Sequence, residues 1–471
     1  AAAAASARSG WAWAPRPPAT HRARKPRTAG SLFTPGGRRA AKLSKIRRGL
    51  SRRNRSCTRG GGLHETLSLS DQTKNDGCNF ETRFVQPLAR ARRAIDYGPK
   101  SPCAACSAHR TSFLTSLGLR ASETRAMADT KAAVDAAQER TKGYLPQIQA
   151  ALDTLKSQGE KPPPLIADAE LYTGKVRDVY KPSKFPQHVV LAATGRQSAF
   201  DRALATVPFK GAVLNQVSRW WFETTKDLAA NHVRASPLPD VLVAARCQAF
   251  PVEFVVRGYI TGSTSTSLWT HYKNGERKYC GLDFPEGLVK NQKLAENVCT
   301  PTTKDAEHDE PISGEDIVAS GRMTQAQWDE CRGKALAIFA RGQEIAASRG
   351  LVLVDTKFEF GLADDGSCVL IDEVLTPDSS RYWLAHSYEA RHAAGQEPEN
   401  IDKEFLRLWY RERCDPYKDE VIPAAPDELV CELSRRYILL YELITGETFD
   451  FQAAAAAVDR PAVLAECLAG L

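Results

Sequence analysis

The sequence has little that would place it in a membrane or in a disulfide framework. No run reaches the roughly 18 consecutive apolar residues that a membrane-spanning helix needs, so we expect no membrane partner. Its 12 cysteines are scattered. Only Cys103 and Cys106 lie close together, and a zinc site would need a second pair or histidines at matching spacing. We therefore expect reduced thiols, as in a cytosolic or stromal protein.

Acidic residues are almost missing from the first part of the chain. The first one is Glu65, and residues 1–126 hold 25 Lys and Arg but only 6 Asp and Glu, a net charge of +19. The remaining residues hold 39 basic and 50 acidic side chains, a net charge of −11. The overall +8 therefore hides an acidic body behind a basic leader, which argues against a nucleic-acid partner.

The leader, residues 1–126, is rich in Arg, Ser, Ala, Pro and Gly and has no apolar pattern long enough to build a core. This composition is typical of organelle transit peptides. The chain does not begin with Met, and Met127 is the first one. Two other interpretations therefore stay open: translated upstream sequence with Met127 as the true start, which predicts the cytosol, or a basic arm that binds nucleic acid.

Beyond the leader, runs of strands precede runs of helices, which predicts an α+β fold in two lobes. We expect one helix over Met127–Lys156 and a long helix over Thr324–Gly350, with Thr324 as N-cap and Gly350 just past the end. The other expected strands are Leu165–Tyr172, His188–Ala193, Val241–Ala244 and Glu253–Ile260, and the other helices are Val213–Thr225, Ser379–Gly395, Asp402–Glu412 and Asp427–Gly446.

The expected domain organisation follows from these elements. A smaller N-lobe with an antiparallel sheet covers residues 165–256, and a larger α+β C-lobe covers residues 257–450. A helix and linker at 127–164 precede the lobes, and an Ala-rich tail at 451–471 follows them.

Two acids are expected to face each other on a β-hairpin whose arms are Leu351–Leu362 and Cys368–Thr376. Asp365-Gly366 is a strong signal for a two-residue turn, because a type I′ turn needs positive φ at both central residues. That turn places Glu359 opposite Asp372, Lys357 opposite Val374 and Asp355 opposite Thr376. Side chains two apart share a face. One surface is therefore expected to carry Asp355, Lys357, Glu359, Asp372 and Thr376.

Directly opposed like charges destabilise a sheet, so the pair of Glu359 and Asp372 needs a neutralising partner. Paired carboxylates are hard oxygen ligands that suit Mg²⁺ carrying the phosphates of a nucleotide. The alternative is a solvated sheet face on which Lys357 bridges the two acids.

Two further segments group cations with small residues. In Gly174–Tyr180 a Gly would let the backbone approach a phosphate, with Lys175, Arg177 and Val179 on one strand face; surface cations on an ordinary strand are the alternative. Arg257–Ser263 ends a strand before an expected helix start, which suits a phosphate or is an ordinary helix cap.

Two loops complete the set of candidate segments. Thr302–Asp309 is a polar loop of the kind that is often functional, or a solvated charge run. After Asp372 the strand ends at Pro377, Asp378 or Ser379 is expected to cap a helix, and Arg381 falls in its first turn. A cation there opposes the helix dipole, so either it binds an anion or it is an exposed, energetically neutral Arg.

These motifs together resemble the SAICAR synthetase family of purine biosynthesis over about residues 165–450. The order and spacing agree, and Trp220-Trp-Phe222 is similar to the plant and algal branch, which fits a plastid leader. The resemblance is carried by Gly174-Lys-Val-Arg-Asp-Val-Tyr180, Ser198-Ala-Phe-Asp201, Lys210-Gly-Ala-Val-Leu-Asn-Gln216, Arg257-Gly-Tyr-Ile-Thr-Gly-Ser263, Lys304 to Asp309, Val354-Asp-Thr-Lys-Phe-Glu-Phe-Gly361, Asp372-Glu-Val-Leu-Thr-Pro-Asp-Ser-Ser-Arg381, Asp402-Lys-Glu-Phe-Leu-Arg407 and Ser434 to Gly446.

The resemblance implies a reaction, its cofactors and its site residues. ATP, bound between the lobes, would activate carboxyaminoimidazole ribonucleotide (CAIR) as an acyl phosphate that L-aspartate attacks, giving SAICAR, ADP and phosphate. It implies Mg²⁺ at Glu359 and Asp372, and the nucleotide at Gly174, Lys175, Arg177 and Lys357. The substrate side would take Arg257, Ser263, Asp378, Ser379 and Arg381, with weaker assignments for Lys304, Asp309, Lys403 and Arg407. No catalytic nucleophile and no oligomeric state follow from it.

One departure and one rival remain. The family usually has Asp-Arg before Ser-Ala-Phe-Asp, whereas here Gly195 precedes Arg196, so the role of that loop stays open. The rival function is a small-molecule kinase on a related two-lobed ATP-binding fold.

Overall fold

The computed structural model describes residues 127–157, 164–200, 202–304 and 309–471. They all belong to the second of two compact units, Tyr97–Leu471. The leader, residues 1–126, is not among the described residues. The fold is α+β in two lobes, as the sequence predicts, and every ladder within its sheets is antiparallel. In the described part of the chain, no helix is both long and apolar enough to cross a membrane.

The first lobe is built on a five-stranded sheet with strand order β1-β2-β3-β7-β6. β3 and β7 are short apolar runs that include Val, a residue that favours strands. The strand at His188–Ala193 is confirmed, and the predicted strand at 165–172 is shorter and begins later. The strands are β1 (Ala169–Thr173), β2 (Arg177–Pro182), β3 (His188–Ala193), β6 (Val233–Leu238) and β7 (Val241–Ala245).

The second lobe is built on a six-stranded sheet with a long central strand, β13 (Leu351–Leu362). β13 lies between β8 (Gln248–Ile260) on one side and β14 (Cys368–Ile371) and β15 (Ser380–Leu384) on the other. The far side of β8 pairs with β11 (Gln292–Cys299) and β12 (Thr302–Thr303).

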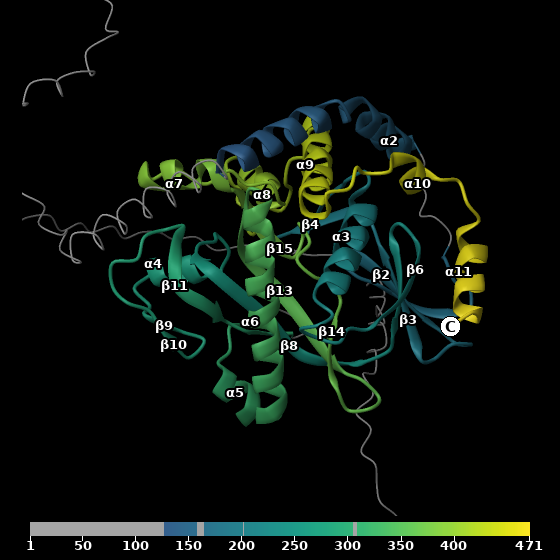
Figure 1. Ribbon diagram of the computed structural model, residues 1–471, viewed down its shortest axis with the longest axis horizontal. Coiled ribbons are helices and arrows are strands. Elements are labelled where there is room, and N and C mark those ends of the chain that lie inside the picture. The colour runs from purple at the N-terminus through teal and green to yellow at the C-terminus, as the bar shows by residue number, and fades with distance from the viewer. Residues whose placement is uncertain (1–126, 158–163, 201, 305–308) are drawn as a thin grey trace, which may run out of the picture. The chain divides into compact units, whose positions relative to one another are not determined.

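One face of this sheet is covered by α6 (Gln325–Ser348), which runs across it in Figure 1. Thr324 caps α6 in a capping box with Gln327, and Gly350 adopts a positive φ of 75° just past its end, so both predicted boundary signals are confirmed. The core against α6 includes Phe254, Phe358 and Phe360, which are fully buried. The opposite face of β13 is left for polar side chains.

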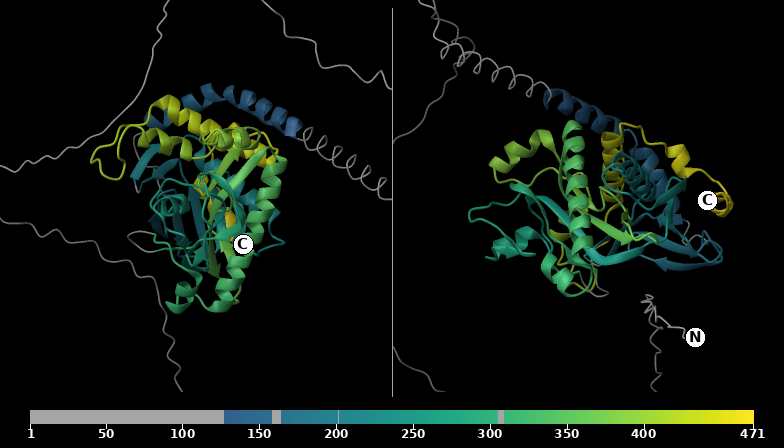
Figure 2. Two further views of the ribbon diagram at one scale, coloured as in Figure 1. Left: turned by 90° about the vertical axis from the view of Figure 1, so that its left-hand side faces the viewer. Right: turned by 60° about the horizontal axis from the view of Figure 1, so that its bottom comes forward.

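Two helices, α3 (Lys210–Thr224) and α11 (Arg460–Ala469), pack on strands of the first sheet, and two more pack on α3 or on each other. α9 (Asp427–Thr445) contacts both α2 (Leu145–Ser157) and α3, and Figure 2 shows α2 and α9 along one side of the molecule. The C-terminal helix α11 packs on β6 and buries Leu464 and Leu468. The Ala-rich tail is therefore ordered by a small apolar core that it shares with the first sheet.

The remaining elements are short. Two-stranded ladders form from β4 (Arg196–Ala199) with β5 (Arg202–Thr206) and from β9 (Lys278–Tyr279) with β10 (Leu282–Asp283). The remaining helices are α4 (Leu268–Lys273), α5 (Gly314–Ala319), α7 (Ala385–Ala393), α8 (Glu404–Arg411) and α10 (Phe451–Ala455).

Two of the predicted helices are wrong in extent. The helix predicted over 127–156 is interrupted after residue 142, at Gly143, because Gly weakens a helix and the following Pro146 suits only a first turn. The helix predicted from Ser379 begins only at Ala385, since Ser380–Leu384 is the strand β15. Its aromatic residues Tyr382 and Trp383 are good strand formers and pair with β13.

Candidate active site

The polar face of β13 carries Asp355, Lys357 and Glu359, as the two-residue period of a strand predicts. On β8, Arg257 pairs with Asp355 and Glu253 pairs with Glu359, so the same face continues across both strands. A register shift between Leu353 and Asp355 reverses which residues face α6 along β13. The bulge therefore allows a charged row to follow a buried apolar row on one strand.

The predicted register of the hairpin is wrong by one residue. Glu359 pairs with Ile371 rather than Asp372, and the turn closes between Ala363 and Ser367 around a three-residue loop that ends in Gly366 with φ of 84°. Three-residue loops of this kind end in a residue with positive φ, and the Asp365-Gly366 signal does not distinguish them from two-residue turns.

The second arm also ends earlier than predicted. β14 stops at Ile371, so the predicted pairs of Lys357 with Val374 and of Asp355 with Thr376 do not form. Asp355 pairs with Arg381 of β15 instead, and the Thr376 hydroxyl donates to Glu373 over 2.6 Å.

Asp372 nevertheless meets Glu359, because its backbone turns out of the strand. Its φ of 65° is uncommon for a residue with a side chain. Lys357 Nζ donates to Glu359 Oε1 over 2.7 Å and to Asp372 Oδ2 over 2.9 Å, so both carboxylates converge on one point. Such backbone outliers gather at functional sites.

Lys357 therefore bridges the two acids, as the alternative interpretation of the sequence supposed, but the face is only partly exposed to solvent. Glu359 is buried. Burial acts to lower the pKa of Lys357, but Asp372 and Glu359 outweigh it and hold that pKa well above its usual value. For Asp372 burial is likewise outweighed, by Lys357 and Arg177, and its pKa is lowered. Both partners are therefore charged at neutral pH.

Two more charged groups that the sequence did not single out extend this acidic cluster. Glu253 lies 4.0 Å from Lys357 and accepts from the Thr302 hydroxyl over 3.2 Å, and burial raises its pKa. Glu373 follows Asp372 directly and is buried. Lys304 forms an ion pair with Glu359, so it reaches the acids rather than the arginines described below.

Arg177 of the first lobe also reaches these acids. Its guanidinium donates to Glu373 over 2.7 Å and to Asp372 over 3.3 Å. The predicted strand face of Lys175, Arg177 and Val179 is wrong for Lys175, because β2 begins at Arg177 and Lys175 lies in the preceding turn.

Hydrogen bonds from Thr194 and Arg196 hold the turn that contains Lys175 in place. Arg196 donates to the Gly174 carbonyl over 3.0 Å and to Asp178 over 2.7 Å, and the Thr194 hydroxyl donates to the Val176 carbonyl over 2.6 Å. Between them, a Cβ at Gly195 would lie 2.8 Å from the Val207 carbonyl oxygen, which leaves no room for a side chain without a shift.

Asp378 lies in a third group of charges. Lys210, fully buried at the start of α3, lies 3.3 Å from it, and the Tyr437 hydroxyl donates to it over 3.0 Å. Lys403 is 3.9 Å away. Burial raises the pKa of Asp378, but Lys210 and Lys403 outweigh it and lower the pKa. Lys210 and Tyr437 were missed, since only the fold brings α3 and α9 to this loop.

Arginines gather at the other end of the charged face. Arg381 donates to Asp355 over 2.9 Å, and Arg257 lies 3.7 Å from the same carboxylate. Glu404 accepts from the Ser263 hydroxyl over 2.9 Å and from Arg407 over 3.3 Å. The predicted substrate residues Arg257, Ser263, Arg381 and Arg407 thus lie close to one another. Ser379 and Asp309 are placed less directly.

Ser379 lies beside Thr376, with 3.1 Å between their hydroxyl oxygens, and the predicted helix that it or Asp378 would cap does not form there. Asp309 contributes to the raised pKa of Glu253, so it lies toward the acidic end. Its predicted neighbour His308 lies outside the described residues.

The residues present fit a Mg²⁺ ion whose remaining ligands come from phosphates. Glu359 and Asp372 offer carboxylate oxygens aimed at one position, the one that Lys357 Nζ contacts. No group of three or more His, Cys, Asp or Glu in the described ranges is placed to hold a metal alone. Mg²⁺ at nucleotide sites commonly uses one or two carboxylates together with phosphate oxygens.

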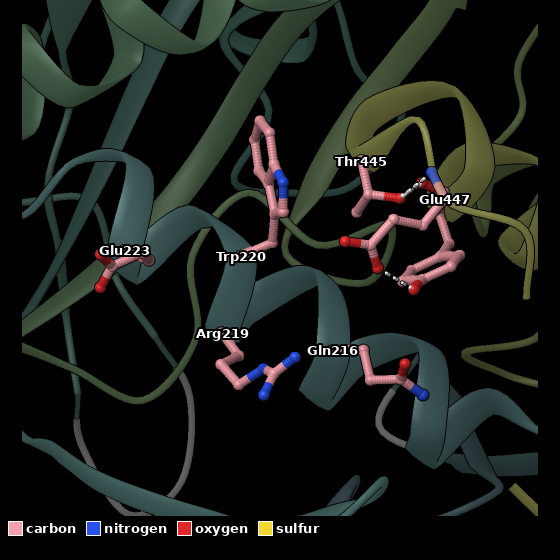
Figure 3. A pocket seen from close by; sticks show the side chains of 7 residues that line it. Gln216, Arg219, Trp220, Glu223, Thr445 and Glu447 are labelled. Carbon is pink, nitrogen blue, oxygen red and sulfur yellow. Dashed lines mark hydrogen bonds between the residues drawn. The ribbon is translucent and has the colours of Figure 1, made fainter. Parts of the chain in front are cut away.

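A separate cavity of about 260 Å³ lies between α3 and the end of α9 (Figure 3). Trp220 forms part of its wall, and Arg219 and Glu223 are exposed at its edge. No residue of the charged face lines it. Since mutually perturbed charges cluster at functional sites, the charged face is the candidate active site.

Comparison with known proteins finds related chains over this part of the sequence. A model of the SAICAR synthetase family matches residues 170–424, which include all the charged residues of the face. A phosphoribosylaminoimidazole-succinocarboxamide synthase of Legionella pneumophila is 60% identical over 278 residues, 59% of this chain and 88% of that protein. The chloroplastic enzyme of that name from Arabidopsis thaliana is 60% identical over 277 residues, 59% of this chain and 67% of that protein.

A solved structure matches this chain as well. The SAICAR synthase of Saccharomyces cerevisiae, in complex with SAICAR, is 28% identical to this chain with a TM-score of 0.52. The match covers 62% of this chain and 99% of the yeast chain.

Proposed function

This chain belongs to the SAICAR synthetase family, and from that membership we infer that it is an ATP-dependent ligase of purine biosynthesis. It joins L-aspartate to CAIR and gives SAICAR, ADP and phosphate. The rival kinase function is not favoured, because the relatives that match over most of their length carry the synthase name.

One observation carries the placement of this chemistry: Arg177 of one lobe and Lys357 of the other meet on Asp372. A phosphoryl group moving from ATP needs cations on several sides and an exact position, rather than a nucleophilic side chain. We propose that Arg177 and Lys357 contact the ATP phosphates, and that Gly174 and Lys175 cover them from the turn before β2.

In the first step a carboxylate oxygen of CAIR attacks the γ-phosphorus of ATP, the bond to the β-phosphate oxygen breaks, and ADP leaves. In the second, the aspartate nitrogen attacks the acyl carbon, phosphate leaves and the nitrogen loses a proton. The residues around Asp372, among them Arg177 and Lys357, act by holding the reactants in line and by balancing negative charge as it moves.

We propose that Glu359 and Asp372 hold Mg²⁺ together with the nucleotide. The ion would supply positive charge against the phosphates of the nucleotide. Lys357 contacts both acids. When the ion and the nucleotide bind, its ammonium group would give up part of these contacts and donate to phosphate oxygens instead.

At the other end, we propose that Arg257, Ser263 and Arg381 bind the phosphate of the ribonucleotide, with Arg407 nearby. Arg guanidinium groups suit phosphate because they donate two parallel hydrogen bonds. Asp378, held ionised by Lys210 and Lys403, would face the ribonucleotide between the two ends, and Ser379 would lie beside it. Lys403 lies on this side as well, and Asp309 and Lys304 lie toward the metal end.

The test is release of phosphate by the 471-residue protein with ATP, Mg²⁺, CAIR and aspartate, each omitted in turn. We expect release only when all four are present. Phosphate release that persists without aspartate would contradict the ligase function, and ADP formation without free phosphate would favour the kinase instead.

For the leader, we propose import into a plastid, since the Arabidopsis and Vigna relatives are chloroplastic. Residues 1–126 fused to a fluorescent protein should enter isolated chloroplasts and become shorter by cleavage. A fusion that stays outside would support translation from Met127 in the cytosol. Tight, salt-sensitive binding of the fusion to DNA or RNA would support the basic-arm interpretation.

A further inference from the structure

Glu404 occupies the hydrogen-bonding groups that the proposed function assigns to the ribonucleotide phosphate. Its carboxylate is buried at the start of α8. It accepts from the Ser263 hydroxyl over 2.9 Å and from Arg407 over 3.3 Å, and it lies 3.7 Å from Arg381. One hydroxyl and two guanidinium groups around an oxyanion are the set of donors that recognises a phosphate.

The space beside Ser263 is also taken. The cavity bordered by Gly262, Ser263, Arg381 and Glu404 has a volume of about 20 Å³. A single water needs roughly 10–15 Å³ of such volume, so the space beside Ser263, as it stands, holds little more than one water.

The charge on Glu404 is secure. Burial raises its pKa, but Arg381 and Arg407 outweigh burial and lower the pKa to about 2, so it is an anion at neutral pH. The Nε of Arg407 is buried and has no hydrogen-bond partner among the described residues. Arg407 therefore has one N–H donor without an acceptor, and an oxygen of an incoming phosphate could accept from it.

We propose that Glu404 is an internal competitor of the substrate's phosphate and so sets the affinity for the ribonucleotide. This inference rests on the proposed function. Binding of the phosphate displaces the Glu404 carboxylate from Ser263 and Arg381, and departure of the product restores it.

The competition has a kinetic purpose. CAIR and SAICAR carry the same phosphate, so a tight grip on it would slow product release as much as it aids substrate binding. Interactions that are equal in substrate and transition state lower KM without raising kcat. A competitor that weakens this uniform binding speeds the exchange of product for substrate.

The experiment compares the full-length protein with its Glu404→Gln variant by calorimetric titration with SAICAR and with the SAICAR ribonucleoside, which lacks the phosphate. Loss of the competing charge should lower the Kd for SAICAR about tenfold, the scale of one charged hydrogen bond. The Kd for the ribonucleoside should not change. In turnover, KM for CAIR should fall and kcat should not rise.

The matched control is Glu412→Gln, an exposed glutamate at the other end of α8, which should change neither Kd. Weaker or unchanged binding of SAICAR by Glu404→Gln would overturn the proposal, because Glu404 would then only orient the arginines. A gain shared equally by the ribonucleoside would overturn it as well.

Two further outcomes are distinguishable. If Glu404→Gln does not fold, as judged by its melting transition, Glu404→Asp keeps the charge but withdraws it from Ser263, and it should bind SAICAR a few-fold more tightly. If the unaltered protein binds no SAICAR and shows no aspartate-dependent turnover, the proposed function fails, rather than the role of Glu404 within it.

Discussion

The two ends of the charged face of β13 differ in the sign of their excess charge. At the Glu359 end four carboxylates, those of Glu253, Glu359, Asp372 and Glu373, surround three cations, whereas at the Asp355 end three arginines surround Asp355 and Glu404. An acidic excess suits a metal ion with its phosphates, and a basic excess suits a phosphate alone. Residues only two or four positions apart on one strand thus serve opposite ligands, because their neighbours on other strands differ.

The strongest test of the acidic end removes one of its metal ligands. Asp372→Asn should lower turnover about a thousandfold, the cost of removing a major electrostatic contact in a transition state. Stability should change little, because Lys357 keeps Glu359 as its partner. Phosphate release and thermal unfolding measure the two effects.

Asp364→Asn, at the exposed tip of the same hairpin, is the control and should leave both quantities unchanged. Near-normal turnover of Asp372→Asn or of Glu359→Gln at low Mg²⁺ concentration would contradict the assignment of these acids to the metal.

The pKa values of two aspartates sharpen the comparison. Asp372 at the acidic end has a lowered pKa, because direct contacts with Lys357 and Arg177 outweigh burial. At Asp402, which is close to Glu404, burial raises the pKa to about 6 although Arg381 acts to lower it. The hydrogen bonds that its carboxylate accepts come from the backbone N–H groups of Tyr382 and Glu404.

A raised pKa in the folded state gives stability that is complete below the unfolded value, near 4, and is lost as pH rises through 6. The free energy of unfolding of the protein, relative to that of Asp402→Asn, should therefore fall by about 2 kcal/mol between pH 4 and pH 7. Urea unfolding at several pH values measures this difference. A difference that stays constant with pH would show that Asp402 is solvated.

The basic end is tested by Arg381→Lys. Lys carries the charge without the planar fork of Arg, so KM for CAIR should rise roughly 30-fold, about 2 kcal/mol, while KM for ATP stays the same. Arg413→Lys on the exposed surface is the control. A rise in KM for ATP instead would place Arg381 with the nucleotide.

The smallest expected effect concerns the loop that holds the Gly174 turn. Gly195→Ala would place a Cβ 2.8 Å from the Val207 carbonyl oxygen, so it should destabilise the protein by about 1–2 kcal/mol and raise KM for ATP a few-fold through Arg196.

Gly333→Ala is the matched control, because Gly333 lies within α6 with open space around it. It should stabilise the protein by about 0.5–1 kcal/mol. Melting curves compare the two variants. An unchanged melting temperature for Gly195→Ala would mean that the Val207 backbone shifts at little cost in free energy.

Much of the candidate site could be predicted from local pattern. Alternation along a strand was enough to place Asp355, Lys357 and Glu359 on one face, and the capping box was enough to start α6 at Thr324. The register of the hairpin was not predictable, because Asp365-Gly366 fits two turn lengths. Nor was the strand β15, since Ser379–Leu384 follows a Pro and resembles a capped helix start.

The sequence by itself determined the charge row on β13, the two-lobed α+β fold and the family to which the chain belongs, because these follow from periodicity and from motifs in order. Only the tertiary structure decided which charges meet. Arg177, Lys210 and Tyr437 reach the acids from distant elements. The positive φ of Asp372 turns its carboxylate toward Glu359, although the two residues do not pair in the sheet. Such contacts depend on how sheets and helices pack against one another, which short-range pattern does not specify.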